Sequence, residues 1–162
     1  GTFSKCIAPA IRVSYLVLPT HLLLRYRSQT SFYASTVSRI DQNILYQFLA
    51  GGYFERHLNR MRAVYKTKHD LLLEQIEPLR ERFEIRGEHA GIHILLTSRQ
   101  GESEEQLIQK AEEAGVKVYG LSSYFIHPQH NHRPATVVLG YASLSEEQIV
   151  EGIRLLMECW GA

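Results

Sequence analysis

Residues 136–160 read TVVLGYASLSEEQIVEGIRLLMECW, and this stretch indicates the fold class most clearly. Its first part is short, apolar and β-branched, which is typical of a strand. Ser145, with Gln148 three residues later, predicts a capping box at the start of a helix. The apolar side chains of that helix recur at helical spacing and predict one buried face, formed by Ile149, Ile153, Leu156 and Trp160. A strand that leads into an amphipathic helix indicates an α/β domain.

The residues before this stretch repeat the alternation of strands and helices. Residues 103–115, SEEQLIQKAEEAG, predict a second capped helix, with Ser103 at the N-cap, Gln106 three residues on and Gly115 past its end. The segments FEIRG (83–87), GIHILLTS (91–98) and VKVYG (116–120) are short and apolar, so each predicts a strand. Residues 121–135 predict a loop. A small, mainly antiparallel sheet packed with helices is therefore expected.

The first half of the chain predicts mostly helices. RVSYLVLP (12–19) is apolar and predicts a strand that Pro19 ends, and THLLLRYRSQ (20–29) predicts a short helix. Ser38, followed by Asp41, predicts the start of another helix, which ends at the glycines at 51 and 52. A long helix is expected from about Tyr53 to Leu79. Its apolar stripe indicates core packing and consists of Phe54, Leu58, Met61, Tyr65, Leu72 and Ile76.

Composition excludes several classes of protein. The 18 basic and 17 acidic side chains give a net charge of +1, which argues against a large nucleic-acid-binding surface within this chain. Cys6 and Cys159 lie at opposite ends, so neither a disulfide framework nor a zinc site is indicated, and a cytoplasmic location is expected. No apolar run approaches the ~20 residues of a membrane span, so no membrane partner is expected.

The candidate for chemistry is Lys5, in the stretch TFSKCIAPAIRVSYLVLP (2–19). Most lysines are solvated surface residues. Here, however, Thr2 and Ser4 add two hydroxyls and Arg12 adds a planar guanidinium, and these groups suit a phosphate dianion. A lysine beside a phosphate cradle suits pyridoxal 5′-phosphate (PLP), an aldehyde cofactor that forms a Schiff base with an amine.

This stretch resembles the lysine motif of fold type I PLP enzymes of the class I/II aminotransferase group. In that motif a serine or threonine, any residue, a serine and the lysine are followed by a proline and by an arginine seven residues after the lysine. The resemblance implies that Lys5 is the Schiff-base lysine and that Thr2, Ser4 and Arg12 hold the cofactor phosphate, with Pro9 shaping the turn between them.

Four more stretches narrow the resemblance to the MocR-type (GabR-like) subgroup of GntR transcription regulators. They are GGYFERHLNRMRAVYKTKHDLLLEQI (51–76), HAGIHILL (89–96), GVKVYGLSSYF (115–125) and LGYASLSEEQIVEGIRLL (139–156). The family resemblance implies the C-terminal part of a fold type I aminotransferase-like domain. Residues 1–52 would end the large PLP-binding domain and form interdomain helices, and residues 53–162 would form the small domain. It further implies a homodimer, an amine or amino-acid effector, and DNA binding through a winged helix-turn-helix upstream of this chain.

The choice between a regulator and an enzyme depends on the strand before the last helix. Class I/II aminotransferases usually carry an arginine at the start of that strand, where it grips the substrate carboxylate. The region around Thr136 has none, and Arg133, three residues earlier, either reaches the pocket as an effector ligand or is a solvated loop residue. This favours a regulator over an enzyme. An aminotransferase acting on an amino acid is the alternative, and a free-standing interaction domain is a third, weaker hypothesis.

The remaining candidates for metal or effector binding are histidines and loop side chains that carry hydroxyls. His127, His130 and His132 alternate in a loop, but no nearby cysteine or carboxylate completes a closed zinc site. We therefore expect no metal and interpret the loop as a possible cover for the cofactor pocket. His89 and His93 are interpreted as structural. Three further side chains either face the effector or form an ordinary solvated turn: Ser122, Ser123 and Tyr124.

Overall fold

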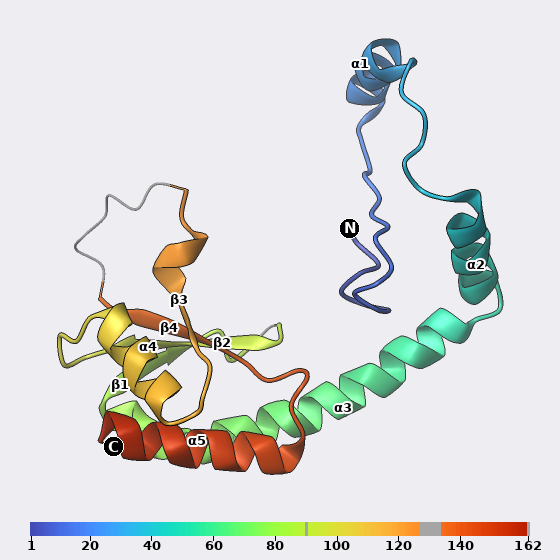
Figure 1. Ribbon diagram of the computed structural model, residues 1–162. Helices are drawn as coiled ribbons and strands as arrows, with labels where there is room; N and C mark the ends of the chain where they lie inside the picture. The colour runs from blue at the N-terminus through green and yellow to red at the C-terminus, as the bar shows by residue number, and fades with distance from the viewer. Residues whose placement is uncertain (90, 127–133, 162) are drawn as a thin grey trace. The chain divides into compact units, whose positions relative to one another are not determined.

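The computed structural model describes residues 1–89, 91–126 and 134–161, and it divides into two compact units, residues 1–62 and 63–162 (Figure 1). Unit 1 holds the helices α1 (Thr20–Thr30) and α2 (Arg39–Ala50) and the first part of α3 (Tyr53–Gln75). The rest of α3 belongs to unit 2, together with η1 (Glu77–Glu81), β1 (Phe83–Arg86), β2 (His93–Ser98), α4 (Glu104–Glu113), β3 (Tyr119–Gly120), η2 (Leu121–Tyr124), β4 (Thr136–Gly140) and α5 (Glu146–Trp160).

The sheet of unit 2 has the strand order β1-β2-β4-β3, and all its neighbours are antiparallel. The register pairs Ile85 with Leu96 and Leu96 with Val137, so these side chains lie on the same face. That face carries the hydrophobic core, to which α3, α4 and α5 contribute apolar side chains. The expected α/β class, with a mainly antiparallel sheet packed with helices, is confirmed.

Both capping boxes form as the sequence predicts. The N–H of Gln106 donates to Ser103 Oγ at 3.2 Å, and the N–H of Ser103 donates to Gln106 Oε1 at 3.0 Å. Ser145 and Gln148 make the same reciprocal pair at the start of α5. Each box satisfies backbone donors that a helix start leaves free. The predicted face of α5 is entirely buried: Ile149, Ile153, Leu156 and Trp160.

The long helix α3 is shorter than expected, because it ends at Gln75 and not at Leu79. Pro78 lacks the N–H that would continue the helical hydrogen bonds, and it disfavours the α conformation at the preceding residue. The chain therefore tightens into η1, where the N–H of Leu79 donates to the carbonyl of Ile76 at 2.9 Å. The expected core stripe is buried only at its C-terminal end, at Leu72 and Ile76.

The strand predicted for residues 12–19 does not form. Its one bridge is an isolated antiparallel pairing of Ser14 with Thr2. Leu16 and Val17 are 74% and 82% exposed, since none of the described strands lies beside them. An apolar β-branched run becomes a strand only when a neighbouring strand takes up its backbone hydrogen bonds. Unit 1 as a whole buries a single apolar side chain, Leu45.

None of the helices in the described part of the chain is both long enough and apolar enough to span a membrane.

Gly152 offers a direct stability test, because it lies inside α5 with open space beside it. A Cβ added there would meet no atom within 4 Å. Because alanine favours a helix interior over glycine, we expect Gly152→Ala to raise the free energy of unfolding by about 0.5–1 kcal/mol in urea titrations. Gly161→Ala is the matched control and should lower it, because Gly161 caps α5 with φ of 71°, a left-handed conformation that side chains disfavour. Destabilisation by Gly152→Ala would contradict this account.

Glu102 ties the start of α4 to η1 and the sheet. Its Oε1 accepts from Arg82 Nη2 at 2.7 Å and from Lys110 Nζ at 3.1 Å. Burial alone raises the pKa of Glu102, but the hydrogen bonds from Arg82 and Lys110 outweigh it and hold the pKa below its ordinary value. A carboxyl pKa that is lower in the folded state stabilises the fold fully above the ordinary value, and this stabilisation is lost as the pH falls through the lowered one.

We therefore expect the free energy of unfolding to fall as the pH drops from about 5 towards 3. Glu102→Gln should flatten this acid slope, since the variant has no carboxylate to protonate at that position. Urea titrations at a series of pH values measure both curves. Parallel curves for the two proteins would show that Glu102 does not carry the slope.

Candidate functional site

The candidate site is a loop at the start of unit 1 whose two arms are joined by backbone hydrogen bonds. The N–H of Phe3 donates to the carbonyl of Val13 at 2.9 Å, and the N–H of Tyr15 donates to the carbonyl of Gly1 at 2.9 Å. These bonds place residues 1–3 antiparallel to residues 13–15. All four predicted cofactor ligands, at positions 2, 4, 5 and 12, therefore belong to one closed loop.

Lys5 lies in a single helical turn at the far end of this loop. We call residues 3–7 the lysine turn. The N–H groups of Cys6 and Ile7 both donate to the carbonyl of Phe3, at 3.3 and 2.9 Å. Lys5 itself is exposed, and its ammonium group has no hydrogen-bond or ion-pair partner among the described residues. The amine is thus held on an ordered turn and remains accessible to a ligand.

The two predicted phosphate hydroxyls face the inside of the loop. Thr2 Oγ1 donates to the carbonyl of Val13 at 3.3 Å, and Ser4 Oγ donates to the carbonyl of Ile11. A hydroxyl has one proton to donate, so each of these is already in use. To donate to a phosphate, both hydroxyls must rotate away from these carbonyls. In this conformation they stabilise the loop.

Arg12 is exposed and keeps most of its donors available. Its Nη1 makes one long bond, of 3.4 Å, to the carbonyl of Pro9. The residue also lines an open cavity of about 480 Å³, together with the polar side chains of Thr36, Ser38 and Asp41. A cavity of this size is in the range that small ligands occupy. The guanidinium is therefore placed where an anionic group could reach it.

The first turns of α3 contact the lysine turn. His57 Nε2 lies 3.0 Å from the carbonyl oxygen of Cys6, the residue after Lys5. Phe54, three residues before His57 on the same helix, meets the ring of Phe3 edge-on, with the ring centroids 6.1 Å apart. From the sequence, Phe54 is expected only as a core residue and His57 is not singled out. The only signal available was their spacing of three, which places them on one helix face.

No protein-family model matches the chain. Similar proteins are nevertheless found over nearly its full length. The HTH-type transcriptional regulators YdeL and YhdI of Bacillus subtilis are 42% and 39% identical to it, and each alignment covers 99% of this chain and 34% of the regulator. The probable rhizopine catabolism regulatory protein MocR of Rhizobium meliloti is 29% identical over 96% of this chain and 31% of that protein. The chain thus spans about a third of the length of these relatives.

Solved structures give the fold. A multiple substrate aminotransferase from Thermococcus profundus superposes with a TM-score of 0.85 at 27% identity, covering 98% of this chain and 39% of that enzyme. The chain has the fold of part of an aminotransferase, and its sequence is similar to transcriptional regulators that include MocR. A second solved structure, LysN, an α-aminoadipate aminotransferase from Thermus thermophilus, superposes with a TM-score of 0.83 at 25% identity.

The other predicted residues lie outside this loop in the sequence. Arg133 and the three loop histidines, His127, His130 and His132, lie outside the described residues. Ser123 Oγ donates to the carbonyl of Gly120 at 2.8 Å, which is an ordinary turn contact. In the part of the chain that the structure describes, no group of three or more histidine, cysteine or acidic side chains could hold a metal ion.

A carboxylate that sequence analysis missed joins the two ends of the β3–β4 connection. Glu104 Oε2 accepts from the N–H of Ser122 at 3.1 Å, and Oε1 accepts from the N–H of Thr136 at 3.2 Å. Its Oε2 would lie only 2.4 Å from a Cβ at position 120, so Gly120 leaves the space that the carboxylate needs. Glu104 therefore fixes the start of β4.

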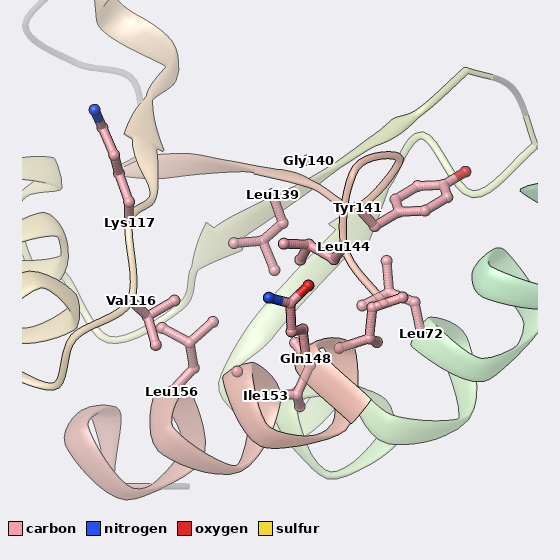
Figure 2. A pocket seen from close by; sticks show the side chains of 12 residues that line it. Leu72, Val116, Lys117, Leu139, Gly140, Tyr141, Leu144, Gln148, Ile153 and Leu156 are labelled. Carbon is pink, nitrogen blue, oxygen red and sulfur yellow. The ribbon is translucent and has the colours of Figure 1, made fainter. Parts of the chain in front are cut away.

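A second cavity lies in unit 2, between the end of β4 and α5 (Figure 2). It measures about 60 Å³, and its lining is mainly core side chains such as Leu139, Leu144 and Ile153. Its lining also includes one charged side chain, Lys117, and one amide side chain, Gln148. Pockets for cofactor-sized molecules are several hundred Å³. This cavity is thus a packing gap and not a cofactor site.

Proposed function

We propose that the protein containing this chain is a PLP-binding, effector-sensing transcription regulator of the MocR type. In this proposal the chain is the C-terminal part of its aminotransferase-like domain. Residues 1–52 complete the large cofactor domain and the interdomain helices, and residues 53–162 form the small domain. The observation that carries the proposal is the exposed amine of Lys5 on an ordered turn, within the same closed loop as Thr2, Ser4 and Arg12.

The donor set of this loop fits PLP in its chemistry. The phosphate of PLP is an acceptor-only dianion, and the loop offers two hydroxyls and a guanidinium as donors. PLP, when bound, supplies an aldehyde that condenses with amines and a ring that withdraws electrons. Arg12 would bind the phosphate, the hydroxyls of Thr2 and Ser4 would turn from their carbonyls towards it, and Lys5 would present its amine to the aldehyde.

The exposed apolar surface of unit 1 supports the assignment to part of a larger domain. Leu16, Val17, Phe32 and Tyr33 are each more than 70% exposed. Exposed apolar side chains that adjoin one another are typical of surfaces that contact other protein, and these four form two sequence-adjacent pairs. We propose that the rest of the large domain and the second subunit of a homodimer cover them. Binding of an amine or amino-acid effector would shift the equilibrium between two orientations of the small domain relative to the large domain. This shift would change DNA binding by a winged helix-turn-helix domain outside this chain.

An aminotransferase acting on an amino acid is the second candidate. It is favoured by the aminotransferases among the solved structures, whose fold the chain shares. Against it stand the higher identity to regulators and the absence of an arginine at Thr136, where Glu104 instead accepts the backbone N–H. Arg133 remains a proposed effector ligand. Fold similarity alone does not separate the two functions.

Two assays on the full-length protein separate the candidates. The first measures transamination between a panel of amino acids and 2-oxo acids in the presence of PLP. The second measures binding to the DNA upstream of its own gene, with and without PLP and the same amino acids. We expect negligible turnover and DNA binding that one amine changes by about tenfold, within the usual range of allosteric coupling. Steady turnover at ~1 s⁻¹ or faster, without DNA binding, would establish the aminotransferase instead.

A further inference from the structure

The carbonyl of Cys6 is the point at which a hydrogen bond joins the lysine turn to α3. This oxygen belongs to the peptide directly after Lys5, and within the described residues its partner is the imidazole of His57, with Nε2 at 3.0 Å. The two residues are 51 positions apart in the chain. The backbone bonds within the turn all converge on the carbonyl of Phe3 and fix the shape of the turn. Its placement against α3 depends on the His57 bond and on the ring contact of Phe3 with Phe54.

A ring contact with Phe48, which belongs to a chain of aromatic contacts, helps to hold His57 in place. The ring of Phe48 meets the imidazole edge-on, with centroids 6.2 Å apart. Phe48 also contacts Phe54 edge-on at 6.3 Å, and Phe54 in turn contacts Phe3 in the lysine turn at 6.1 Å. The imidazole is partly buried by these contacts. Its direction is therefore set by the packing between α2 and α3, and the Nε2 atom faces the carbonyl as a donor.

We propose that His57 is a positioning residue for Lys5. By donating Nε2–H to the Cys6 carbonyl, it fixes the orientation of the lysine turn, and so keeps the amine of Lys5 directed towards a ligand whose phosphate Arg12 holds. The inference rests on the proposed PLP function and adds to it a residue outside the lysine motif. Loss of this bond frees the turn to reorient, which lowers the fraction of time that the amine and the phosphate donors are placed together.

The test measures trapping of PLP on individual lysines of the full-length protein. The amine of Lys5 and the aldehyde join with loss of water, and borohydride then delivers a hydride to the carbon of the new C=N bond while water protonates the nitrogen. Peptide mass spectrometry gives the labelling rate at each lysine. Lys117 serves as the internal reference, because it is exposed and lies in unit 2.

His57→Leu removes the donor, whereas His57→Gln keeps an N–H at nearly the same reach. We expect the ratio of Lys5 to Lys117 labelling to fall about fivefold in His57→Leu, the factor that loss of an ordinary hydrogen bond gives, and to stay within about twofold of wild type in His57→Gln. Arg60→Leu, an exposed change on the same helix, should leave the ratio unchanged.

The outcomes separate this inference from the proposed function. No preferential label at Lys5 in the wild-type protein overturns both. Preferential label at Lys5 that His57→Leu does not reduce, or that His57→Gln reduces equally, overturns the role of His57 and leaves the proposed function standing. If His57→Leu fails to fold, His57→Asn replaces it, since its amide is too short to reach the carbonyl; equal labelling in the asparagine and glutamine variants would then overturn the inference.

Discussion

Trp160→Ala is expected to lower the free energy of unfolding of unit 2 by about 3–5 kcal/mol. Trp160 is 1% exposed, and its ring lies 5.0 Å from that of Phe83 between the ring centroids. Its Nε1 donates to the carbonyl of Leu107 at 3.0 Å, which joins the end of α5 to α4. Truncation would leave a large cavity and would also remove the side-chain hydrogen bond between α5 and α4. Urea unfolding followed by circular dichroism measures the loss.

Trp160→Phe is the matched control, because it keeps most of the apolar volume and removes the hydrogen bond. We expect it to cost about 1–3 kcal/mol, clearly less than the alanine variant. A loss below ~1.5 kcal/mol in Trp160→Ala would mean that α5 does not anchor the core of unit 2 as the structure indicates.

The second large effect is a difference in backbone protection between the two units of the isolated chain. Amides of β2, β4 and α5 should be protected from hydrogen exchange by about 10³–10⁴, because opening them requires unfolding of the core of unit 2. Amides of α1 and α2 should be protected less than about tenfold, because short helices without tertiary packing are marginal in water. Unit 1 buries only Leu45.

Exchange measured by mass spectrometry at peptide resolution tests this expectation. The first part of α3 is the informative region, since the helix continues from unit 1 into unit 2. Uniform strong protection from Gly1 onward would contradict the account. It would show that unit 1 is stable without the surfaces that we propose to cover it.

The fold of unit 2 could be predicted from sequence because the patterns that mark its helices and strands lie within a few consecutive residues. The capping boxes at Ser103 and Ser145 involve residues three positions apart, and period-two apolar runs mark the strands. The end of α3 was misplaced because Pro78 acts on the turn before it, so the helix ends three residues ahead of the proline. The strand expected at residues 12–19 failed for a different reason, since a strand depends on a partner that local sequence does not contain.

The site was predictable only in part, because sequence patterns mark local contacts and not contacts between distant residues. Thr2, Ser4, Lys5 and Arg12 fall within eleven consecutive residues, and their grouping was visible as a motif. His57 and Glu104 reach their backbone partners across 51 and 32 residues, respectively, and no local pattern marks such a contact. The hydrogen bonds from Thr2 and Ser4 to backbone carbonyls of the same loop were also unexpected. Hydroxyl groups that could donate to a ligand can equally donate to nearby carbonyls.

The central claim is that Lys5 carries PLP in a MocR-type regulator, and one measurement tests it most directly. The full-length protein is incubated with PLP, fixed with borohydride, digested and analysed by peptide mass spectrometry, beside the Lys5→Ala variant. The account predicts one pyridoxyl group per chain, located on Lys5, and no comparable label in Lys5→Ala. Label no stronger at Lys5 than at another exposed lysine such as Lys117, or equal labelling of the wild-type and Lys5→Ala proteins, would overturn it.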